Sequence, residues 1–517
     1  MYTLKETLLS EIEGFRQLGH QFVNGEINRA DFKGISGGMG VYAHRDGKNF
    51  MIRLRMPGGV VSKEQLKGVY KWAQKYQLSF VHLTTRQAIQ LHGLTIDQVC
   101  EVMEEALAYD IYTRGGGGNF PRNVATSPLS GVEAGEAFDI TPYALLVNTH
   151  FVERMCTYKL PRKFKAAFSN NGLDHANCTV TDIGFLAVQH ENNPYFKLYL
   201  GGGLGKNSST GVVFDELVAP KDVLYHVEAI IKLFMAEGDY QNKGKARIRY
   251  IAQRMGEEAF IACYRHYLER EKQRGGLDLA VDLKTIEREG LEILNENHSR
   301  LFKQKQKGLY SIYTHPVGGQ LETNDLKELL DALEQLEEPD IRLTMTEGFY
   351  IRQLNGKEAE HMLEITEPMG GGTRFEQSTA CIGVPICQVG FLNGQSTLLD
   401  SIKYLKDQGL TRDILPAVRI SGCPNSCGTH EVGTLGFVGK MKKVGDKMSP
   451  VFELHIKGST SPENLKLAMY KGDLCQEDIP QFLYELARLI DEEHVDFSEW
   501  LLKHDGAFAE LFQKFEV

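Results

Sequence analysis

The sequence lacks the long apolar stretches of a membrane protein. No run resembles the ~20 consecutive apolar residues of a transmembrane helix. The first residues, MYTLKETLLSEIEGFRQLG, are amphipathic and acidic, unlike a secretory signal. Positive charge is also in deficit, with a formal net charge of −10 at pH 7, which argues against a general polyanion binder but not against a local basic pocket. These absences predict a cytoplasmic protein with no membrane or nucleic-acid partner.

The cysteines do not form the pattern of a disulfide framework. There are nine, an odd number. Five are scattered and are expected to be small buried hydrophobes, namely Cys100, Cys156, Cys178, Cys263 and Cys475. The other four are gathered in two pairs near the end of the chain, and this cluster needs its own explanation.

A nucleotide-binding loop is also missing. The stretch LYLGGGLGKNSS (198–209) is rich in glycine but lacks the G-x-x-x-x-G-K-[ST] spacing of a phosphate loop. No flavin or nicotinamide module is evident elsewhere. The glycine content is nevertheless high, 52 of 517 residues, which is typical of tight turns and of backbone packed close to ligands.

What the chain does contain is an internal repeat. The segment from Ile52, IRLRMPGGVVSKEQLKGVYKWAQKYQLSFVHLTTRQAIQLHGL, matches the segment from Ile312 without a gap. Gly58-Gly59 aligns with Gly318-Gly319, and Leu83-Thr84 with Leu343-Thr344. Both segments are extended, reach Gly-Gly, enter an amphipathic helix and return as a β-rich run. A constant register over so many residues indicates duplicated β-α-β units.

A second pair of segments follows the first. LPRKFKAAFS from Leu160 and DIGFLAV from Asp182 correspond to LPAVRISGCPN from Leu415 and TLGFVGK from Thr434. The chain is therefore expected to have the order A-B-A′-B′, an α+β architecture with pseudo-twofold symmetry. Apolar spacing predicts mainly helical structure over 222–274 and 479–515. Such duplication favours a ligand at the interface between the halves, with Arg and Lys from the first half and Cys from the second.

The clustered cysteines have a distinctive spacing. Five residues separate Cys381 from Cys387, and three separate Cys423 from Cys427. Zinc sites usually contain a C-x2-C knuckle, and a redox dithiol is a single C-x2-C pair. Four cysteines without that motif fit a 4Fe–4S cluster better, while a zinc site and structural cysteines remain open. Pro385 and Pro424 bend the two loops so that the thiols can point to one centre.

A second constellation is basic. Arg53 and Arg55 share one face of a predicted strand, as do Lys163 and Lys165. Further candidates lie in GGGGNFPRNV, LPRKFK and LTTRQAIQLHG, namely Arg86, Gln90, His92, Arg122 and Arg162. Solvated surface charge is the plain alternative for each. Because the same strands carry Ile, Leu, Phe and Val, some of these cations are expected to line a pocket for a small oxyanion or for tetrapyrrole carboxylates. The glycine-rich loops could add backbone N–H groups to the same anions.

These motifs together resemble the sirohaem-containing sulfite and nitrite reductases. The resemblance rests on the four spaced cysteines with GCPNSCG, LPRKFK, RLRMPGG and LTTRQ, and covers about residues 40 to 510 in the right order. It implies an N-terminal helical segment (1–45), a ferredoxin-like half-domain (46–115), a sirohaem- and substrate-binding domain (116–300), a second ferredoxin-like half-domain (301–370) and a 4Fe–4S/sirohaem-binding domain (371–517).

The resemblance also implies roles for individual residues. Cys381, Cys387, Cys423 and Cys427 would hold the cluster, and the Cys427 sulfur would also ligate the sirohaem iron. The substrate anion would be bound by Arg53, Arg122, Lys163 and Lys165. Contacts to sirohaem or its carboxylates would come from Thr84, Arg86, Gln90, Arg162, Arg247 and Asn425. His82 stands where family members often have Arg. Gly115–Gly118 replaces a loop that carries a Cys in some sulfite reductases, so their Cys–Tyr crosslink is expected to be absent.

The implied activity is the six-electron reduction of sulfite to sulfide, with nitrite to ammonia as the alternative. Lys165 favours sulfite, because a dianion gains more than a monoanion from an added positive charge. Electrons would come from a separate ferredoxin or flavoprotein. A non-catalytic Fe–S carrier, a zinc-stabilised binding module and a tetrapyrrole-pathway oxygenase are the competing hypotheses. The role of His430, next to the second cysteine pair, is left open between support of the site and the surface.

Overall fold

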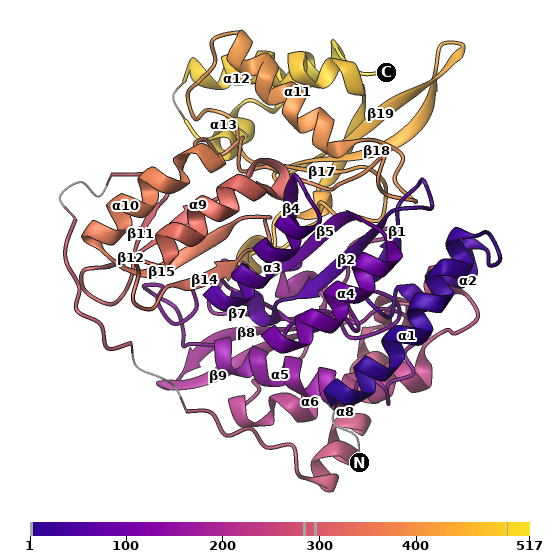
Figure 1. Ribbon diagram of the computed structural model, residues 1–517. Helices are drawn as coiled ribbons and strands as arrows, with labels where there is room; N and C mark the ends of the chain where they lie inside the picture. Colours follow the sequence, from indigo (N-terminus) through magenta and orange to yellow (C-terminus); the bar gives the residue numbers. More distant parts are fainter. Residues whose placement is uncertain (1–3, 283–285, 294–296, 494) are drawn as a thin grey trace.

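The register of the sequence repeat is reproduced in three dimensions. The computed structural model describes residues 4–282, 286–293, 297–493 and 495–517 (Figure 1). The first repeat contains β2 (Phe50–Arg55), β3 (Val60–Val61), α3 (Lys63–Lys75), β4 (Phe80–Leu83), β5 (Ala88–Leu94) and α4 (Ile96–Ala106). The second contains β12 (Leu309–Thr314), β13 (Gln320–Glu322), α9 (Thr323–Leu333), β14 (Asp340–Leu343), β15 (Phe349–Asn355) and α10 (Gly356–Thr366). The predicted β-α-β units are thus confirmed.

Local sequence signals explain where these elements begin. Ser62 caps α3 and Thr95 caps α4, each in a capping box with the glutamine three residues later. The Gly-Gly turns are needed because Gly58 has φ 61° and Gly318 has φ 59°, a left-handed conformation that side chains disfavour. The two turns therefore place strand and helix in the same relation in both repeats.

The two repeats exchange edge strands. One antiparallel sheet has the order β1-β2-β5-β4-β13, and the other has the order β11-β12-β15-β14-β3. Strand β13 of the second repeat pairs with β4, and β3 of the first pairs with β14. At the opposite edges, β1 (Val41–Ala43) completes the first sheet and β11 (Leu301–Lys303) completes the second. This reciprocal exchange gives the predicted pseudo-twofold relation and one hydrophobic core shared by both repeats, with Trp72 fully buried in it.

Two further sheets form the B and B′ units. The first unit contains β6 (Ala125–Thr126), α5 (Thr141–Glu153), β7 (Ala166–Ser169), β8 (Ile183–His190), β9 (Asn193–Leu200), β10 (Val212–Val213), α6 (Val223–Glu237), α7 (Ile248–Met255) and α8 (Glu257–Arg274). The second contains β16 (Thr379–Ala380), α11 (Gly394–Asp407), β17 (Val418–Ser421), β18 (Leu435–Val444), β19 (Lys447–Ile456), β20 (Met469–Cys475), α12 (Ile479–Asp491), α13 (Phe497–Lys503) and α14 (Asp505–Gln513). Both predicted helical stretches are confirmed over their described residues.

The B and B′ sheets have matching topology. In each, the first three strands are parallel and the next pair is an antiparallel hairpin. The β18–β19 hairpin is longer than β8–β9, and its tip projects from the body (Figure 1). Gly184 and Gly436 occupy equivalent positions in the two sheets. A Cβ added at Gly184 would lie 2.0 Å from the carbonyl oxygen of Cys178, and one added at Gly436 would lie 2.2 Å from the carbonyl oxygen of His430. The duplication therefore extends to backbone packing.

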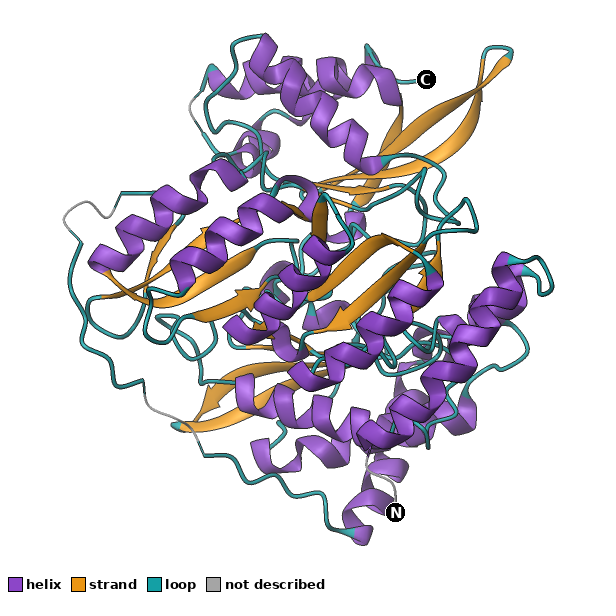
Figure 2. Cartoon of the chain, in the orientation of Figure 1, coloured by secondary structure: helices purple, strands orange, loops and turns teal. Residues whose placement is uncertain are grey.

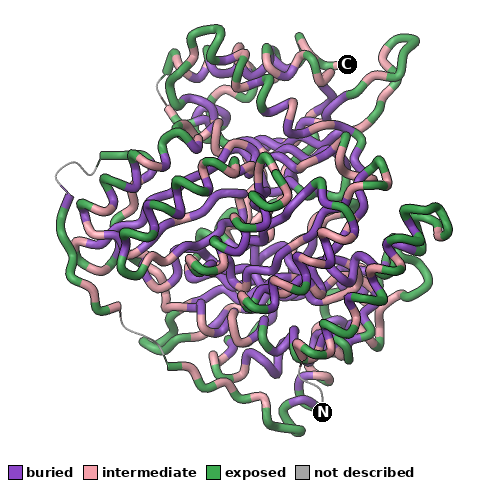
Figure 3. The backbone as a smooth tube through the Cα atoms, viewed as in Figure 1, coloured by how far each residue is buried: buried purple, intermediate pink, exposed green. Residues whose placement is uncertain are grey.

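The remaining helices lie at the amino-terminal end. Helices α1 (Leu4–Val23) and α2 (Arg29–Ser36) precede β1 (Val41–Ala43), so the described residues 4–36 are mainly helical and the chain then joins the first sheet. Helices flank the sheets (Figure 2), and the interiors between the layers are buried (Figure 3). Among the described residues, no helix combines the length and apolar character needed to cross a membrane.

Candidate functional site

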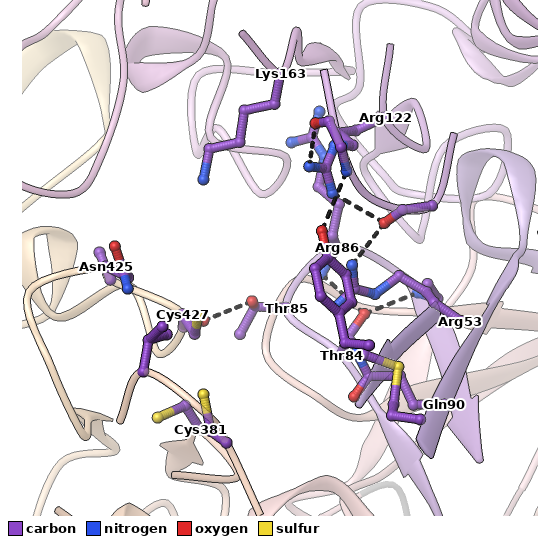
Figure 4. Close-up of a pocket in the computed structure, with 18 of the residues that line it drawn as sticks. Arg53, Thr84, Thr85, Arg86, Gln90, Arg122, Lys163, Cys381, Asn425 and Cys427 are labelled. Atoms are coloured by element: carbon purple, nitrogen blue, oxygen red, sulfur yellow. Dashed lines mark hydrogen bonds between the residues drawn. The ribbon is translucent and has the colours of Figure 1, made fainter. Parts of the chain in front are cut away.

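A cavity of about 890 Å³ lies between the halves and receives residues from all four units. Its size falls within the usual range for a large bound ligand. The predicted site residues that line it are Arg53, Thr84, Arg86, Gln90, Arg122, Arg162, Lys163, Lys165, Cys381, Cys387, Cys423, Asn425 and Cys427. Arginines and thiols approach the same space from opposite sides (Figure 4). Residues from distant parts of the sequence are thus brought to one site.

Strand pairing brings the cysteines together. Strands β16 and β17 run parallel, so their carboxyl ends meet at one sheet edge, where Cys381 and Cys423 follow. The Cys381 sulfur accepts a hydrogen bond from the Gly422 amide at 3.0 Å, and the Asn425 amide approaches the Cys423 sulfur at 3.5 Å. Burial and then the neighbouring Cys427 raise the pKa of Cys381 well above its usual range. Negative charge on one thiol therefore opposes ionisation of the next, and a bound metal centre offsets this repulsion.

The thiol arrangement differs from that of a single-ion site. No three His, Cys, Asp or Glu side chains within the described ranges converge closely enough to hold one metal ion. A zinc ion binds sulfurs at ~2.3 Å and therefore draws them tightly together. A 4Fe–4S cluster is a larger body with one thiolate on each iron. The four thiols line one cavity without such a close group, which fits the larger cluster.

The opposite wall is built on a row across the first sheet. Arg53 on β2 is directly opposite Gln90 on β5, which is in turn opposite His82 on β4. With the Gln90 amide oxygen turned to the guanidinium, Arg53 donates to it from Nη2 at 2.6 Å and from Nε at 2.9 Å. Burial and then Arg53 lower the pKa of His82 to about 4. His82 therefore lines the cavity as a neutral imidazole, at the position where members of the resembling family often have arginine.

The glycine loop acts through its carbonyl groups. Arg53 and Arg122 both donate to the Gly116 oxygen, at 2.6 and 2.9 Å, and Arg122 donates to the Gly118 oxygen at 2.8 Å. The Gly115, Gly116 and Gly118 amides donate to groups of the protein itself. These three amides are therefore already bonded within the protein and are not free to bind the anion. The loop instead aims two arginines.

Two lysines complete this wall. Both Lys163 and Lys165 line the cavity. Neither ammonium group forms a hydrogen bond or an ion pair with another described residue. Burial, then Arg247 and Arg122, lower the pKa of Lys163 to about 7, against the opposing effect of Cys427. Burial and then Lys163 lower the pKa of Lys165. Two buried amines without a partner are stabilised either by binding an anion or by losing a proton.

Arg247 lies behind the wall. Its guanidinium donates to both oxygens of the buried Asp182, at 3.1 and 2.8 Å, and it is not among the residues that line the cavity. Asp182 also accepts from the Lys165 amide at 2.9 Å. Arg247 therefore acts through Asp182 on Lys165, the residue directly before β7, whereas the resemblance implied a contact to the cofactor.

Several lining residues were missed from the sequence. Lys33, Lys159 and Lys243 add charge at the edge of the cavity, and His44 lies beside His92. Glu347 is the one carboxyl among the described residues that line it. The repeat could have revealed Glu347, because the constant register aligns it with Gln87 of LTTRQ.

His430 is buried beneath the second cysteine pair. Its Nδ1 lies 3.1 Å from the Ser421 hydroxyl and 3.5 Å from the Glu431 carboxylate, and its ring packs edge-on against His455. Glu431 also accepts from the Gly205 amide at 2.9 Å and from the Ser208 hydroxyl at 2.7 Å. The surface alternative for His430 is wrong, and the residue supports the loop that carries Cys427.

A duplicated fold with four thiols facing a cationic wall defines an iron–sulfur protein with an anion-binding cavity. Comparisons with known proteins agree. The family model "Nitrite/Sulfite reductase ferredoxin-like half domain" matches residues 42–109 and again 302–369. The model "Nitrite and sulphite reductase 4Fe-4S domain" matches residues 117–272. The matched ranges together span more than half of the chain and include both repeats.

Similar proteins cover nearly the whole chain. A sulfite reductase [ferredoxin] of Mycolicibacterium paratuberculosis is 24% identical over 93% of this chain and 90% of its own length. A ferredoxin–nitrite reductase of Synechococcus elongatus is 25% identical over 84% of this chain and 85% of its own. The solved structure of the Mycobacterium tuberculosis NirA protein has the same fold, with a TM-score of 0.80, 22% identity and coverage of 98% and 96%. The chain belongs to the nitrite and sulfite reductase family.

Proposed function

We propose that this protein reduces sulfite to sulfide, using sirohaem and a 4Fe–4S cluster as its cofactors. The observation that supports this activity most is the cavity itself, where four thiols face Arg53, Arg122, Lys163 and Lys165. Six electrons and eight protons convert one sulfite into hydrogen sulfide and three waters. The bound cofactors supply the electrons and an iron site for the substrate sulfur.

The residues present fit this pair of cofactors. Cys381, Cys387, Cys423 and Cys427 are proposed to hold the cluster, with Cys427 shared with the sirohaem iron. Cys427 is the exposed member of the four, as a shared ligand at the cavity should be. The cationic groups Arg86 and Arg162, with the neutral Thr84, Gln90 and Asn425, are proposed to contact the acidic periphery of sirohaem. Among the described residues that line the cavity, positive side chains far outnumber the single carboxyl of Glu347. They can therefore offset the negative charge of the carboxylates on the cofactor.

The cations then bind and orient the substrate. The Gly116 and Gly118 carbonyls hold the Arg53 and Arg122 guanidiniums in fixed positions. Preorganised donors of this kind stabilise developing charge without reorganisation. Lys163 can pass a proton to a departing oxygen, because an amine with a pKa of about 7 exchanges its proton readily near neutral pH. The arginines remain charged and serve as anion anchors.

Lys165 supports sulfite over nitrite. Its side chain lines the same cavity as Lys163, and burial followed by like-charge repulsion from Lys163 lowers the pKa of its amine. A dianion relieves that repulsion better than a monoanion. Nitrite reduction to ammonia is the second candidate, favoured by the similarity to the Synechococcus elongatus enzyme.

Steady-state kinetics with reduced methyl viologen test the proposal. We expect kcat/KM to be higher for sulfite than for nitrite, and a large excess for nitrite would refute the assignment. Lys165→Asn should lose more activity on sulfite than on nitrite. Lys243→Asn, at the exposed edge of the same cavity, is the matched control and should affect both substrates little. Equal losses on both substrates in Lys165→Asn would remove the basis for preferring sulfite.

The electron donor is proposed to be ferredoxin, with a flavoprotein as the alternative, and the compartment the cytoplasm. Ferredoxin is the donor in the names of both relatives described above. The thiol loop offers a contact surface, since Val389 and Phe391 beside Cys387 are 44% and 53% exposed. Large apolar side chains at the surface next to a redox centre suit a transient protein partner.

A further inference from the structure

Glu347 and Gln87 are counterparts in the two repeats. Both follow a strand at the end of a Leu-Thr-x-x pattern, in LTTRQ and in LTMTE. Both have left-handed backbone conformations, with φ 52° at Gln87 and 67° at Glu347. Because residues with side chains seldom adopt this conformation, its occurrence at both positions indicates that each side chain is held in a defined place.

Gln87 uses both ends of its amide. Its oxygen accepts from the Thr126 amide at 2.9 Å. Its nitrogen donates to the Thr126 carbonyl at 2.9 Å and to the Leu343 carbonyl of the other repeat at 2.7 Å. The side chain thus ties β6 to the first repeat and the first repeat to the second.

Glu347 reproduces the accepting half of this pattern. Its Oε2 accepts from the Ala380 amide at 2.9 Å, and Ala380 ends β16 as Thr126 ends β6. Ala380 directly precedes Cys381, so this bond fixes the start of the thiol loop. The carbonyl of Leu83 is the counterpart of the Leu343 carbonyl. In the first repeat, Gly59 is bordered by Gln87 and the Leu343 carbonyl. In the second, Gly319 is bordered by Glu347 and the Leu83 carbonyl.

A carboxylate could not complete the pattern, because it has no hydrogen to donate to a carbonyl oxygen. We infer that Glu347 is a neutral carboxylic acid that takes the place of a glutamine amide, accepting from Ala380 and donating to the Leu83 carbonyl. It is a positioning residue that joins the thiol loop to the opposite repeat. Its neutrality leaves no charged carboxyl among the described residues that line the anion-binding cavity.

The surroundings agree with this inference. Glu347 is 2% exposed, and within the part of the chain that the structure describes it forms no ion pair. Burial raises the pKa of its carboxyl well above the usual range, although the Ala380 amide and Arg419 oppose this. An isolated buried carboxylate is costly, so such a group retains its proton.

A second carboxyl near the thiols provides the contrast. Glu431 is also buried, yet it accepts from Ser426, Ser208 and the Gly205 amide and lies beside His430. Although burial opposes ionisation, His430 and these donors hold the pKa of Glu431 below its usual value. Two carboxyls on either side of one thiol set are thus held in opposite protonation states.

Infrared difference spectroscopy of the holoenzyme at pH 7 tests the inference. We expect wild type to show the C=O stretch of a protonated carboxyl that is lost in Glu347→Gln and retained in Glu431→Gln. If wild type and Glu347→Gln have the same carboxyl C=O absorption, the inference is overturned. The band does not depend on which anion is reduced, so failure of the proposed sulfite activity would leave this result unaffected.

Structural readouts provide the second arm. Glu347→Gln should keep the melting temperature and the iron content of wild type, because glutamine makes both hydrogen bonds. Glu347→Ala should lower the melting temperature by a few degrees and reduce iron content. The midpoint potential of the cluster should rise in Glu431→Gln, which loses a negative charge, and stay unchanged in Glu347→Gln. A comparable rise in both variants would show that Glu347 is ionised.

Discussion

The Thr85 hydroxyl donates a hydrogen bond of 2.7 Å to the carbonyl oxygen of Cys427. The two residues are 342 positions apart in the chain, on loops of the first and the fourth unit. This bond joins the LTTRQ turn, which lines the cavity, to the backbone of Cys427, whose sulfur is proposed to bind both cofactors. Thr84 and Arg86 flank it in the same turn (Figure 4).

Removing that bond should disturb the site more than the fold. Thr85→Val keeps the shape of the side chain and loses a hydrogen bond worth about 1 kcal/mol. We expect a shifted haem absorption band and a fall in kcat of about fivefold, consistent with that energy. Thr149→Val, which removes an exposed hydrogen bond within α5, is the matched control and should leave the spectrum unchanged. An unaltered spectrum in Thr85→Val would show that the contact does not position Cys427.

Cys427 and Cys423 should differ in their effects. Cys427→Ser should change the haem spectrum as well as the cluster signal, because its sulfur is proposed to be shared. Cys423→Ser should reduce cluster content first, since Cys423 lies on the buried side with its sulfur near Asn425. Cys475→Ser, on β20 away from the cavity, is the control for thiol loss. Electron paramagnetic resonance and optical spectra of the same samples separate the outcomes, and identical spectral changes in both cluster variants would argue against a shared ligand.

Substrate affinity should depend on pH through Lys163. Its pKa of about 7 means that the amine is charged below neutral pH and loses its charge as the pH rises through this value. The KM for sulfite should therefore increase above about pH 7. Lys163→Arg keeps a positive charge throughout, so its KM should show a smaller dependence on pH while kcat falls because arginine does not release a proton. A KM with the same pH dependence in wild type and variant would locate the titrating group elsewhere.

The exposed apolar side chains of the thiol loop should matter only with a protein donor. Phe391 is 53% exposed beside Cys387. Phe391→Ala should raise the KM for reduced ferredoxin by about tenfold, the effect of losing ~1.4 kcal/mol of contact energy. The rate with methyl viologen should remain that of wild type. Leu502→Ala, at a side chain 78% exposed on α13, is the control for an apolar truncation elsewhere on the surface. Equal effects with both donors would show that the variant damages the centre and not a docking surface.

Much of the architecture was readable from the sequence because duplication leaves a visible register. Gly58-Gly59 and Gly318-Gly319 are conspicuous, since a left-handed turn at that place requires glycine in both repeats. The helices over 222–274 and 479–515 follow from apolar spacing. The cysteines were identified because thiols in two closely spaced pairs have few uses other than metal binding.

The sequence by itself determined the repeat, the four thiols and the basic residues that meet them. The tertiary structure alone decided what each charged side chain does, because that depends on partners distant in the chain. The family resemblance implied a cofactor contact for Arg247, but its pairing with Asp182 places it behind the wall. The glycine loop presents carbonyls and not amides, and His430 is buried by strands that pack over it. Glu347 and Glu431 are chemically identical residues, and only the donors that surround each one determine which carries a proton.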